Sequence, residues 1–453
     1  MTLAQILALA IFVVMFGVIT WGKVHRYIPA LVGAALVFII VFFAVMRSPE
    51  VALRVLNFAQ LGHADFWLPG HKAVESTGVN WQTIIFVAGM MIMVEGLAKV
   101  GFFRWMCLLV AKLVRYKTIP ILVTFIILSG FLSMFIDSIT VMLFLASVTI
   151  ELAKMLKFDP VPVIIAEIFA SNTGGSATMS GDPPNIIIGT ALGLTFMDFV
   201  KNTGLIAWAG MLLAIIFFYI AGKKALSKPV KAEANSTAQA AYPGPRDAIT
   251  NFRMFLIHTF IFLLAIVLLI THAQTGISVA SIGVIAAVLT LIATTKDAWH
   301  IFKRTDWRTL VFFIGLFICV GGLEETGVLK ALANFIGDVS GGSLLMVITI
   351  ILWISAFASA IIDNIPFAAT MVPVISNLAG PNMPIAPLAW TLALGTDIGG
   401  NATPIGASAN VVGTAISERE GYPIGWGRFL KYGVPSMILV VGLCWVLLFL
   451  RYT

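Results

Sequence analysis

The chain has 453 residues, of which 60% are hydrophobic and only 11% are charged, whereas a soluble protein carries about 45–50% apolar and about 25% charged residues. This composition excludes a soluble globular protein and predicts an all-α polytopic membrane protein, with the lipid bilayer as a partner. The formal net charge of +7 does not indicate a nucleic-acid partner, because surplus Lys and Arg residues in a membrane protein usually lie in the loops that face the cytoplasm.

Five spanning segments and one helical hairpin are predicted in the first part of the chain, where apolar stretches approach the ~20 residues that cross a bilayer. The first stretch is long and is soon followed by others, so we interpret it as a retained helix rather than a cleaved signal peptide. In chain order the stretches are 2–21, 27–46, 82–98, the hairpin arms 118–136 and 139–153, the interrupted segment 161–197, and 203–222.

A second series of apolar stretches follows a polar segment that is rich in Ala, Pro, Ser and Lys and has the composition of a linker. The stretches are 254–271, 277–293, 309–323, the hairpin arms 343–362 and 365–379, the interrupted segment 385–417, and 432–450. The predicted domains are a first repeat over 1–222, a linker over 223–253 and a second repeat over 254–453.

The two series are copies of one another. Residues 81–101 align with residues 307–327 without a gap and share nine of 21 positions. The same offset of 226 brings "FIDSIT" onto "IIDNIP", and an offset of 225 brings "SNTGGSATMSGDPPN" onto "TDIGGNATPIGASAN". The chain is therefore a duplication.

The distribution of Lys and Arg predicts the orientation of the two copies. With five spans and one re-entrant hairpin in each half, the segments 22–26, 99–117, 154–157, 223–253, 294–308 and 418–431 share one side and hold 22 of the 28 Lys and Arg residues. That side is cytoplasmic by the positive-inside rule. The prediction is an inverted-topology repeat in the cell inner (plasma) membrane, multi-pass, with both termini outside and the linker 223–253 cytoplasmic.

The two interrupted segments are the strongest functional signal. A Gly-Gly pair followed by Pro-Pro breaks a helix, and the freed backbone groups are tolerated in a bilayer only where they line a cavity or find partners. Interruptions at matching positions of two repeats point to a transporter's binding site. A helix kink for close packing would explain one copy but not the repetition. Neutral oxygens come from Thr173, Ser176, Thr178, Ser180 and Asn185 in one copy and Asn401, Thr403, Ser408 and Asn410 in the other.

Four aspartates belong to the hairpins and the interruptions. Asp137 and Asp363 lie where each hairpin must turn, and Asp182 and Asp397 lie in or beside the breaks. Asp is a good helix N-cap, yet an intramembrane carboxylate costs about 2.5–3.5 kcal/mol on insertion scales, and Ser or Asn would cap nearly as well. We therefore expect these residues to combine capping with function.

The charge of these motifs bears on the substrate. The segments 129–140, 171–185, 355–366 and 396–410 contain no Lys, Arg or His. Carboxylates without a fixed cation favour Na⁺, H⁺ or a neutral hydroxyl-rich solute over a multiply charged anion. Whether Glu95 or Glu167 carries protons stays open. The three cysteines fit no metal or redox spacing, and no cofactor is expected beyond a coupling ion, Na⁺ or H⁺.

These motifs resemble the ion transporter superfamily, within it the branch of arsenite permeases, D-type sodium/proton antiporters and the melanosomal P protein, and the resemblance covers almost the whole chain. It implies one hairpin entering from each side, a transport domain that moves in elevator fashion against a scaffold, and a homodimer. The related divalent-anion/sodium symporters bind Na⁺ between hairpin tip and broken helix.

Carried over, the resemblance implies that each hairpin tip faces a broken helix, with Na⁺ possible at Asp137, Asn185, Asp363 and Asn410. The full expected set is Asp137, Ser138, Thr140, Asn172, Thr173, Gly174, Gly175, Thr178, Asp182 and Asn185 in one half-site and Asp363, Asn364, Asp397, Gly399, Gly400, Asn401, Thr403, Ser408 and Asn410 in the other. The chain departs from the symporters by having Asp at both tips and Pro366 in place of a small polar residue.

The function expected first is cation- or proton-coupled antiport or efflux of an inorganic ion or small hydroxy acid, Na⁺/H⁺ or arsenite. The alternative within transport is sodium-coupled uptake of a di- or tricarboxylate such as citrate. A remote alternative is an intramembrane aspartyl protease, which needs two carboxylates sharing a proton; its Gly-x-Gly-Asp element is incomplete in "MSGD". We do not expect an enzyme.

Overall fold

The described part of the chain is built almost entirely of helices. The computed structural model describes residues 1–68, 78–226, 244–295, 297–381 and 383–452, and in these ranges the extended pairing is a single bridge between Gly380 and Met383. Nine helices of the described residues are long and apolar enough to cross a membrane. The all-α class predicted from the sequence is confirmed.

The first copy follows the predicted order of elements. Its helices are α1 (Leu3–Trp21), α2 (Tyr27–Leu36) continued by the π-helical η1 (Val37–Val45), α3 (Pro49–Leu56), η2 (Phe58–Gly62), α4 (Ala64–Trp67), α5 (Trp81–Lys99), α6 (Phe102–Leu113), α7 (Thr118–Ser133), α8 (Ser138–Leu156), α9 (Val161–Gly175), α10 (Pro183–Leu192), α11 (Phe196–Phe199), η3 (Val200–Gly204) and α12 (Leu205–Leu226). The short elements from α3 to α4 have no counterpart in the predicted series.

The second copy repeats this order. It comprises η4 (Pro245–Ala248), α13 (Phe252–Thr275), α14 (Val279–Ala293), α15 (Ala298–Arg304), α16 (Trp307–Glu325), α17 (Val328–Ser340), α18 (Leu344–Ile361), α19 (Asn364–Leu378), α20 (Ile385–Gly399), η5 (Gly400–Ala402), α21 (Ser408–Arg419) and α22 (Trp426–Tyr452). Of the expected linker over 223–253, residues 227–243 lie outside the described residues, and the predicted domain limits stay predictions.

The duplication extends to individual hydrogen bonds. Asn185 Nδ2 donates to Gly175 O at 2.9 Å and to Thr178 O at 3.0 Å. The matching residue of the second copy, Asn410, donates to the matching carbonyls of Gly400 and Thr403 at 2.8 and 2.7 Å. Each asparagine thus satisfies carbonyl groups that the break of its own helix leaves free.

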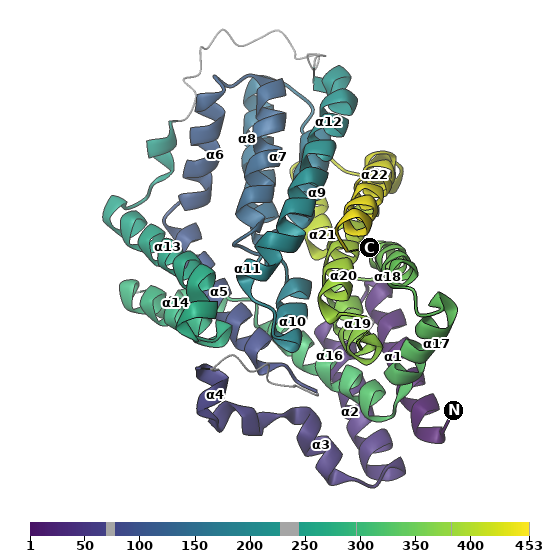
Figure 1. The fold of residues 1–453 in the computed structure, drawn as a ribbon. Helices are drawn as coiled ribbons and strands as arrows, with labels where there is room; N and C mark the ends of the chain where they lie inside the picture. Colours follow the sequence, from purple (N-terminus) through teal and green to yellow (C-terminus); the bar gives the residue numbers. More distant parts are fainter. Residues whose placement is uncertain (69–77, 227–243, 296, 382, 453) are drawn as a thin grey trace.

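The two broken helices run in opposite directions at the centre of the molecule (Figure 1). Helix α10, which continues from α9, packs along α20, and α21, which continues from α20, packs along α9. The two breaks therefore lie side by side in antiparallel order.

The two copies also exchange partners in the surrounding helices. Helix α5 of the first copy packs on α14 of the second, while α16 of the second packs on α2 of the first. Small residues allow both contacts, because an added Cβ at Gly89 would lie 2.1 Å from Gly283 O, and one at Gly315 would lie 2.7 Å from the Ala30 carbonyl carbon. Such close backbone approaches are typical of helix packing in membranes.

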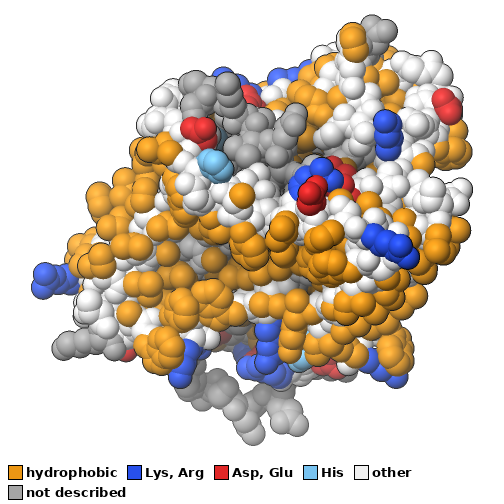
Figure 2. Space-filling model, turned by 90° about the horizontal axis from the view of Figure 1, so that it is seen from below, with side chains coloured by type: hydrophobic (Ala, Val, Ile, Leu, Met, Phe, Trp, Pro, Cys, Tyr) orange, Lys and Arg blue, Asp and Glu red, His pale blue; other side chains and the backbone are white. Residues whose placement is uncertain are grey.

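The exterior is apolar. Large side chains such as Leu205, Ile220 and Phe260, each at least 65% exposed, cover the outside of α12 and α13. Figure 2 shows hydrophobic side chains spread over one face of the molecule, with Lys and Arg mostly towards its margins. The protein is a multi-pass membrane protein, since an aqueous surface would not carry apolar patches of this extent.

Candidate ion and substrate site

The breaks of the two long helices form the buried centre of the molecule. Helix α9 ends at Gly175 and α10 begins at Pro183, and every residue between them is buried. Pro183 and Pro184 occupy the first turn of α10, where their missing N–H groups leave no helical hydrogen bond unmade. In the second copy η5 and residues 403–407 separate α20 from α21. The sequence prediction of two interrupted helices is confirmed.

Both hairpin tips are helix N-caps. The carboxylate of Asp137 accepts hydrogen bonds from Thr140 N at 3.0 Å and from Thr140 Oγ1 at 2.7 Å, at the start of α8. Asp363 caps α19 by accepting from Ile365 N at 3.1 Å. The expected capping role of both residues is therefore observed.

Asp182 is held by both tips at once. Ser138 Oγ donates to Asp182 Oδ1 at 2.7 Å, and Asn364 Nδ2 donates to Asp182 Oδ2 at 3.1 Å. Ser138 and Asn364 occupy matching positions, 226 residues apart, in the two copies. One buried carboxylate of the first break thus joins the hairpins of both halves.

An asparagine network connects the two breaks. Asn172 Nδ2 donates to Asn401 Oδ1 and to Asn410 Oδ1, both at 2.8 Å, and Asn401 Nδ2 reaches Thr173 Oγ1 at 3.5 Å. All four side chains are buried. Polar side chains of both copies therefore meet in one buried network.

Asp397 differs from the other acids of the centre. Its side chain is 0% exposed, and neither carboxylate oxygen makes a hydrogen bond within the described residues. The amide groups of Asn364 and Asn185 lie beside it, and Asp182 is within electrostatic range. Asn185 Oδ1 and Asn172 Oδ1 are also buried without a partner. The centre therefore offers several acceptor oxygens and few free donors.

The structure corrects one inference from the sequence, because a fixed cation does reach the site. Arg26, at the start of α2, donates to Asp363 Oδ2 at 3.1 Å and to Ser408 Oγ at 2.8 Å. Its other terminal nitrogen donates to Thr309 Oγ1 at 2.9 Å, and its guanidinium lies over the Phe312 ring. Arg26 lies outside every motif, in a short loop between two spans, so no sequence signal identified it.

Several expected site residues have structural contacts. Thr178 Oγ1 donates to Met134 O, and its counterpart Thr403 donates to Ala360 O at 2.5 Å, so each break is tied to its own hairpin. Of the four positions expected to hold Na⁺, Asn185 retains an unpartnered oxygen. At the other three, Asp137, Asp363 and Asn410, the side-chain oxygens already accept hydrogen bonds from protein donors.

The expected glycines serve close packing between each broken helix and its hairpin. An added Cβ at Gly174 would lie 2.2 Å from Gly130 O, and one at Gly399 would lie 2.3 Å from Ala356 Cα. Gly175 and Gly400 lie at the breaks themselves, against residues 181–182 and 406–407.

The two glutamates left open by the sequence have different surroundings. Glu95 forms an ion pair with Arg304 at 3.1 Å. Glu167 is 0% exposed; its Oε1 accepts from Thr149 Oγ1 at 2.5 Å and its Oε2 has no partner. Glu167 thus lies in a setting similar to that of Asp397, one turn before Ser171.

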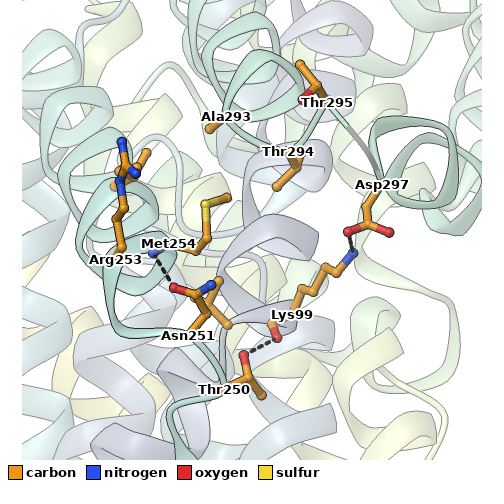
Figure 3. Close-up of a pocket in the computed structure, with 11 residues that line it drawn as sticks. Lys99, Thr250, Asn251, Arg253, Met254, Ala293, Thr294, Thr295 and Asp297 are labelled. Atoms are coloured by element: carbon orange, nitrogen blue, oxygen red, sulfur yellow. Dashed lines mark hydrogen bonds and ion pairs between the residues drawn. The ribbon is translucent and has the colours of Figure 1, made fainter.

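Hollows lie both at the hairpin tips and on the surface away from the centre. A cavity of about 30 Å³ between the hairpin tips and helices α5 and α16 is lined by Asp137, Ser180, Thr309 and Ile365 among others. A larger surface pocket of about 640 Å³ lies at the ends of α5, α13 and α14. Figure 3 shows Lys99 of this pocket reaching towards Asp297, with which it forms an ion pair of 2.6 Å. The larger pocket contains none of the buried acids.

In the part of the chain that the structure describes, two hairpin tips, two antiparallel broken helices and a buried polar centre lie among long apolar helices, an arrangement typical of a membrane transporter. The chain belongs to the citrate transporter family, whose sequence profile (CitMHS) matches residues 16–395. This family lies within the ion transporter superfamily, which the motifs of the sequence resemble.

Relatives that are named as membrane proteins or transporters match almost the whole chain. A 46 kDa membrane protein of Mycobacterium leprae is 31% identical over 454 residues, which cover 99% of both chains. The P protein of Homo sapiens is 28% identical over 528 residues, covering 97% of this chain and 59% of that protein. Another relative, 31% identical over 452 residues, is an uncharacterized transporter of Mycobacterium tuberculosis.

Solved structures share the fold. The YdaH transporter of Alcanivorax borkumensis, described as having an unusual topology, matches with a TM-score of 0.54 at 15% identity and covers 88% of this chain and 86% of that one. MtrF of Neisseria gonorrhoeae, described with a class of antimetabolite efflux pumps, matches with a TM-score of 0.56 at 13% identity, over 91% and 86% of the two chains.

Proposed function

We propose that this protein is a cation- or proton-coupled secondary transporter of the elevator type and not an enzyme. The observation that carries the proposal is the binding of Asp182 by both hairpin tips, through Ser138 and Asn364. A carboxylate shared by two hairpins that come from opposite copies lies where a solute would be handed from one side of the membrane to the other.

The moving part in this proposal consists of the hairpins α7–α8 and α18–α19 with the broken helices α9–α10 and α20–α21. One arm of each hairpin, α7 or α19, has 16 or 15 residues, fewer than the ~20 that span a bilayer, which supports hairpins that enter the membrane and return. The other arms, α8 and α18, have 19 and 18 residues and are among the nine long apolar helices of the described residues. The pairs α5–α14 and α2–α16 would form the scaffold, and a homodimer would assemble through it.

The substrate proposed first is an inorganic ion or a small hydroxy acid, with Na⁺/H⁺ or arsenite as test cases. Three acids, Asp137, Asp182 and Asp397, surround the centre, and acceptor oxygens outnumber free donors there. Carboxylate and carbonyl oxygens are the ligands that hard cations prefer. The direction proposed is antiport or efflux.

Uptake of a di- or tricarboxylate such as citrate is the second candidate, and Arg26 favours it. Its guanidinium already contacts a carboxylate, Asp363, at the edge of the site. The planar fork of Arg suits carboxylate binding, and the family name refers to citrate. A substrate carboxylate that replaced Asp363 on Arg26 would use the same contacts.

Purified protein in vesicles with a trapped pH dye tests the proposal. The vesicles are challenged in turn with Na⁺, Li⁺, arsenite and citrate. We expect proton movement on adding Na⁺, Li⁺ or arsenite, for at least one of the three, and we expect its loss in Asp137→Asn or Asp363→Asn. Uptake of labelled citrate, with no proton movement on adding any of these three, would favour the second candidate. Normal coupled flux in both variants would remove these residues from the mechanism.

The proposed location is the cell inner (plasma) membrane, with the linker 223–253 in the cytoplasm and both termini outside. Single cysteines placed in the linker and at the N-terminus, in a background lacking Cys107, Cys319 and Cys444, can be labelled with an impermeant maleimide in intact cells. We expect the N-terminal cysteine to react and the linker cysteine to react only after lysis.

A further inference from the structure

Asn172 and Asp397 occupy matching positions in the two copies. The offset of 225 that superposes the interrupted segments pairs residue 172 with residue 397. Both side chains are 0% exposed, and both lie in the last turn before a break. One copy has an amide, which carries two hydrogens, where the other has a carboxylate.

The two hydrogens of the Asn172 amide satisfy the acceptor oxygens that surround it. They bind Asn410 Oδ1 and Asn401 Oδ1, both at 2.8 Å. Asn410 can only accept here, because its own amide hydrogens go to Gly400 O and Thr403 O. Every polar group at this junction except Asn172 Oδ1 is therefore satisfied by the protein itself.

The matching junction around Asp397 lacks these hydrogens. Asn185, the counterpart of Asn410, commits both of its amide hydrogens to Gly175 O and Thr178 O. Ser176, the counterpart of Asn401, donates its hydroxyl hydrogen to Thr173 O at 2.7 Å. Both oxygens of Asp397 and Asn185 Oδ1 are left buried and unpartnered.

A bare carboxylate in this position is costly. Its neighbour Asp182 is also acidic, and the other groups beside it, Asn364 and Asn185, are neutral. Asn364 gives one of its two amide hydrogens to Asp182, so at most the other one faces Asp397. Removing an uncompensated ion from water costs several kcal/mol even after relaxation. A positive charge or a proton must replace the two hydrogens that Asn172 supplies in the other copy.

We propose that Asp397, with Asn185 Oδ1, binds one monovalent cation, H⁺ or Na⁺, in the place that the Asn172 amide hydrogens fill in the other copy. This inference rests on the proposed transport function for its role, as the coupling ion. It also predicts how many cations bind. The two matching positions, 172 and 397, together bind one cation, because the amide hydrogens of Asn172 already fill the position that a second cation would occupy.

Cation binding by the purified protein tests this inference independently of solute transport. Unfolding temperature is measured from low to high Na⁺ at constant ionic strength, with choline replacing Na⁺, and separately from pH 5.5 to 8.5 without Na⁺. A ligand that binds only the folded state raises this temperature. We expect a rise with Na⁺ if Na⁺ is bound, or a rise as the pH is lowered if the proton is bound.

Three variants decide between outcomes. In Asp397→Asn we expect the dependence of the unfolding temperature on Na⁺ to disappear and its dependence on pH to weaken, because the new amide donates to Asn185 Oδ1 as Asn172 does to Asn410 Oδ1. The buried acids Asp182 and Glu167 still take up protons in this variant. In Asn172→Asp we expect the unfolding temperature to depend more steeply on the cation, because a second cation site is created. In the double exchange Asn172→Asp/Asp397→Asn we expect the unfolding temperature to depend on the cation as strongly as in the wild type, because one cation site remains. Wild-type dependence in Asp397→Asn, or no dependence in the double exchange, would overturn the inference.

The same variants separate this inference from the proposed function. If the cation dependence follows residues 172 and 397 but vesicles carry no solute, the cation site stands and the transport proposal fails. If solute is carried but the dependence ignores both residues, transport stands and the cation site fails.

Discussion

Asn364, at the start of α19, donates a 3.1 Å hydrogen bond to Asp182 in the break between α9 and α10. The donor belongs to the second copy and the acceptor to the first, so the hairpin of one copy closes on the broken helix of the other. The matching donor of the first copy, Ser138, binds the second oxygen of the same carboxylate. The two halves therefore share one site rather than holding two separate ones.

Removing the Asp182 carboxylate is predicted to loosen both tips. A hydrogen bond to a charged group contributes about 1.5–3 kcal/mol, so we expect Asp182→Ala to destabilise by at least 3 kcal/mol. Asp182→Asn should lose roughly half as much stability, because its amide oxygen can still accept one hydrogen bond while its new amide hydrogens face the Asn364 donor. Chemical unfolding in detergent measures both, and Ser138→Ala, which removes one bond only, is the matched control. Equal stability of Asp182→Ala and wild type would contradict the shared site.

Arg26 is predicted to affect selectivity more than stability. Its ion pair with Asp363 is partly exposed, with 24% and 16% of the side chains accessible, and such pairs contribute about 1 kcal/mol or less. If the protein carries citrate, Arg26→Ala should reduce citrate uptake by about tenfold, the effect of losing ~1.4 kcal/mol of recognition, and should change Na⁺-driven proton movement less than about twofold. Lys154→Ala, which removes a distant exposed cation, is the control. Equal losses of both activities would argue against anion recognition by Arg26.

The glycines at the broken helices are predicted to be intolerant of a methyl group. Gly174→Ala would place Cβ 2.2 Å from Gly130 O, and Gly399→Ala would place it 2.3 Å from Ala356 Cα. Backbone atoms cannot move aside easily, so we expect destabilisation of about 1–3 kcal/mol or more and reduced transport. Gly17→Ala and Gly442→Ala are matched controls, because an added Cβ there meets nothing within 4 Å. The prediction fails if all four variants unfold at the same temperature.

The ion pair between the ends of α8 and α21 is predicted to keep its strength near neutral pH and to lose it in acid. Lys154 Nζ lies 2.6 Å from Glu420 Oε2, and this hydrogen bond lowers the pKa of Glu420 below its usual 4.5. A lowered pKa gives a contribution that is present above pH 4.5 and is lost as the pH falls through the folded-state value. We expect Glu420→Gln to match wild-type pH dependence of unfolding temperature from pH 6 to 8 and to differ below pH 4.5. A difference already at pH 7 to 8 would contradict this.

Much of the architecture could be predicted because its causes are local. The apolar stretches, the Gly-Gly and Pro-Pro pairs and the Asp-Ser and Asp-Asn caps act within a few residues of themselves. They predicted the spans, the interruptions within 171–185 and 396–410 and the two tips, and the structure has a helix end or a cap at each. The duplication could also be read from fixed offsets.

The composition of the site was less predictable. Arg26 lies 337 positions from Asp363 in the chain, and a contact over that separation leaves no mark in local composition. The inference that the site has no fixed cation was wrong for this reason. The four aspartates looked equivalent in sequence, yet Asp137 caps α8 by accepting hydrogen bonds from Thr140, whereas Asp397 makes no hydrogen bond within the described residues.

The sequence by itself determined that this is a duplicated, all-helical membrane protein with two interrupted helices, because hydrophobic length, helix breaking and capping depend on near neighbours. Only the tertiary structure decided which polar groups meet. The antiparallel packing of the two copies brings each break against the other. As a result Asp182 accepts two hydrogen bonds, the Asn172 amide donates to the other copy, and the described residues give Asp397 no hydrogen bond. Hydrogen-bond satisfaction in a buried centre is a property of the assembled copies and not of either segment alone.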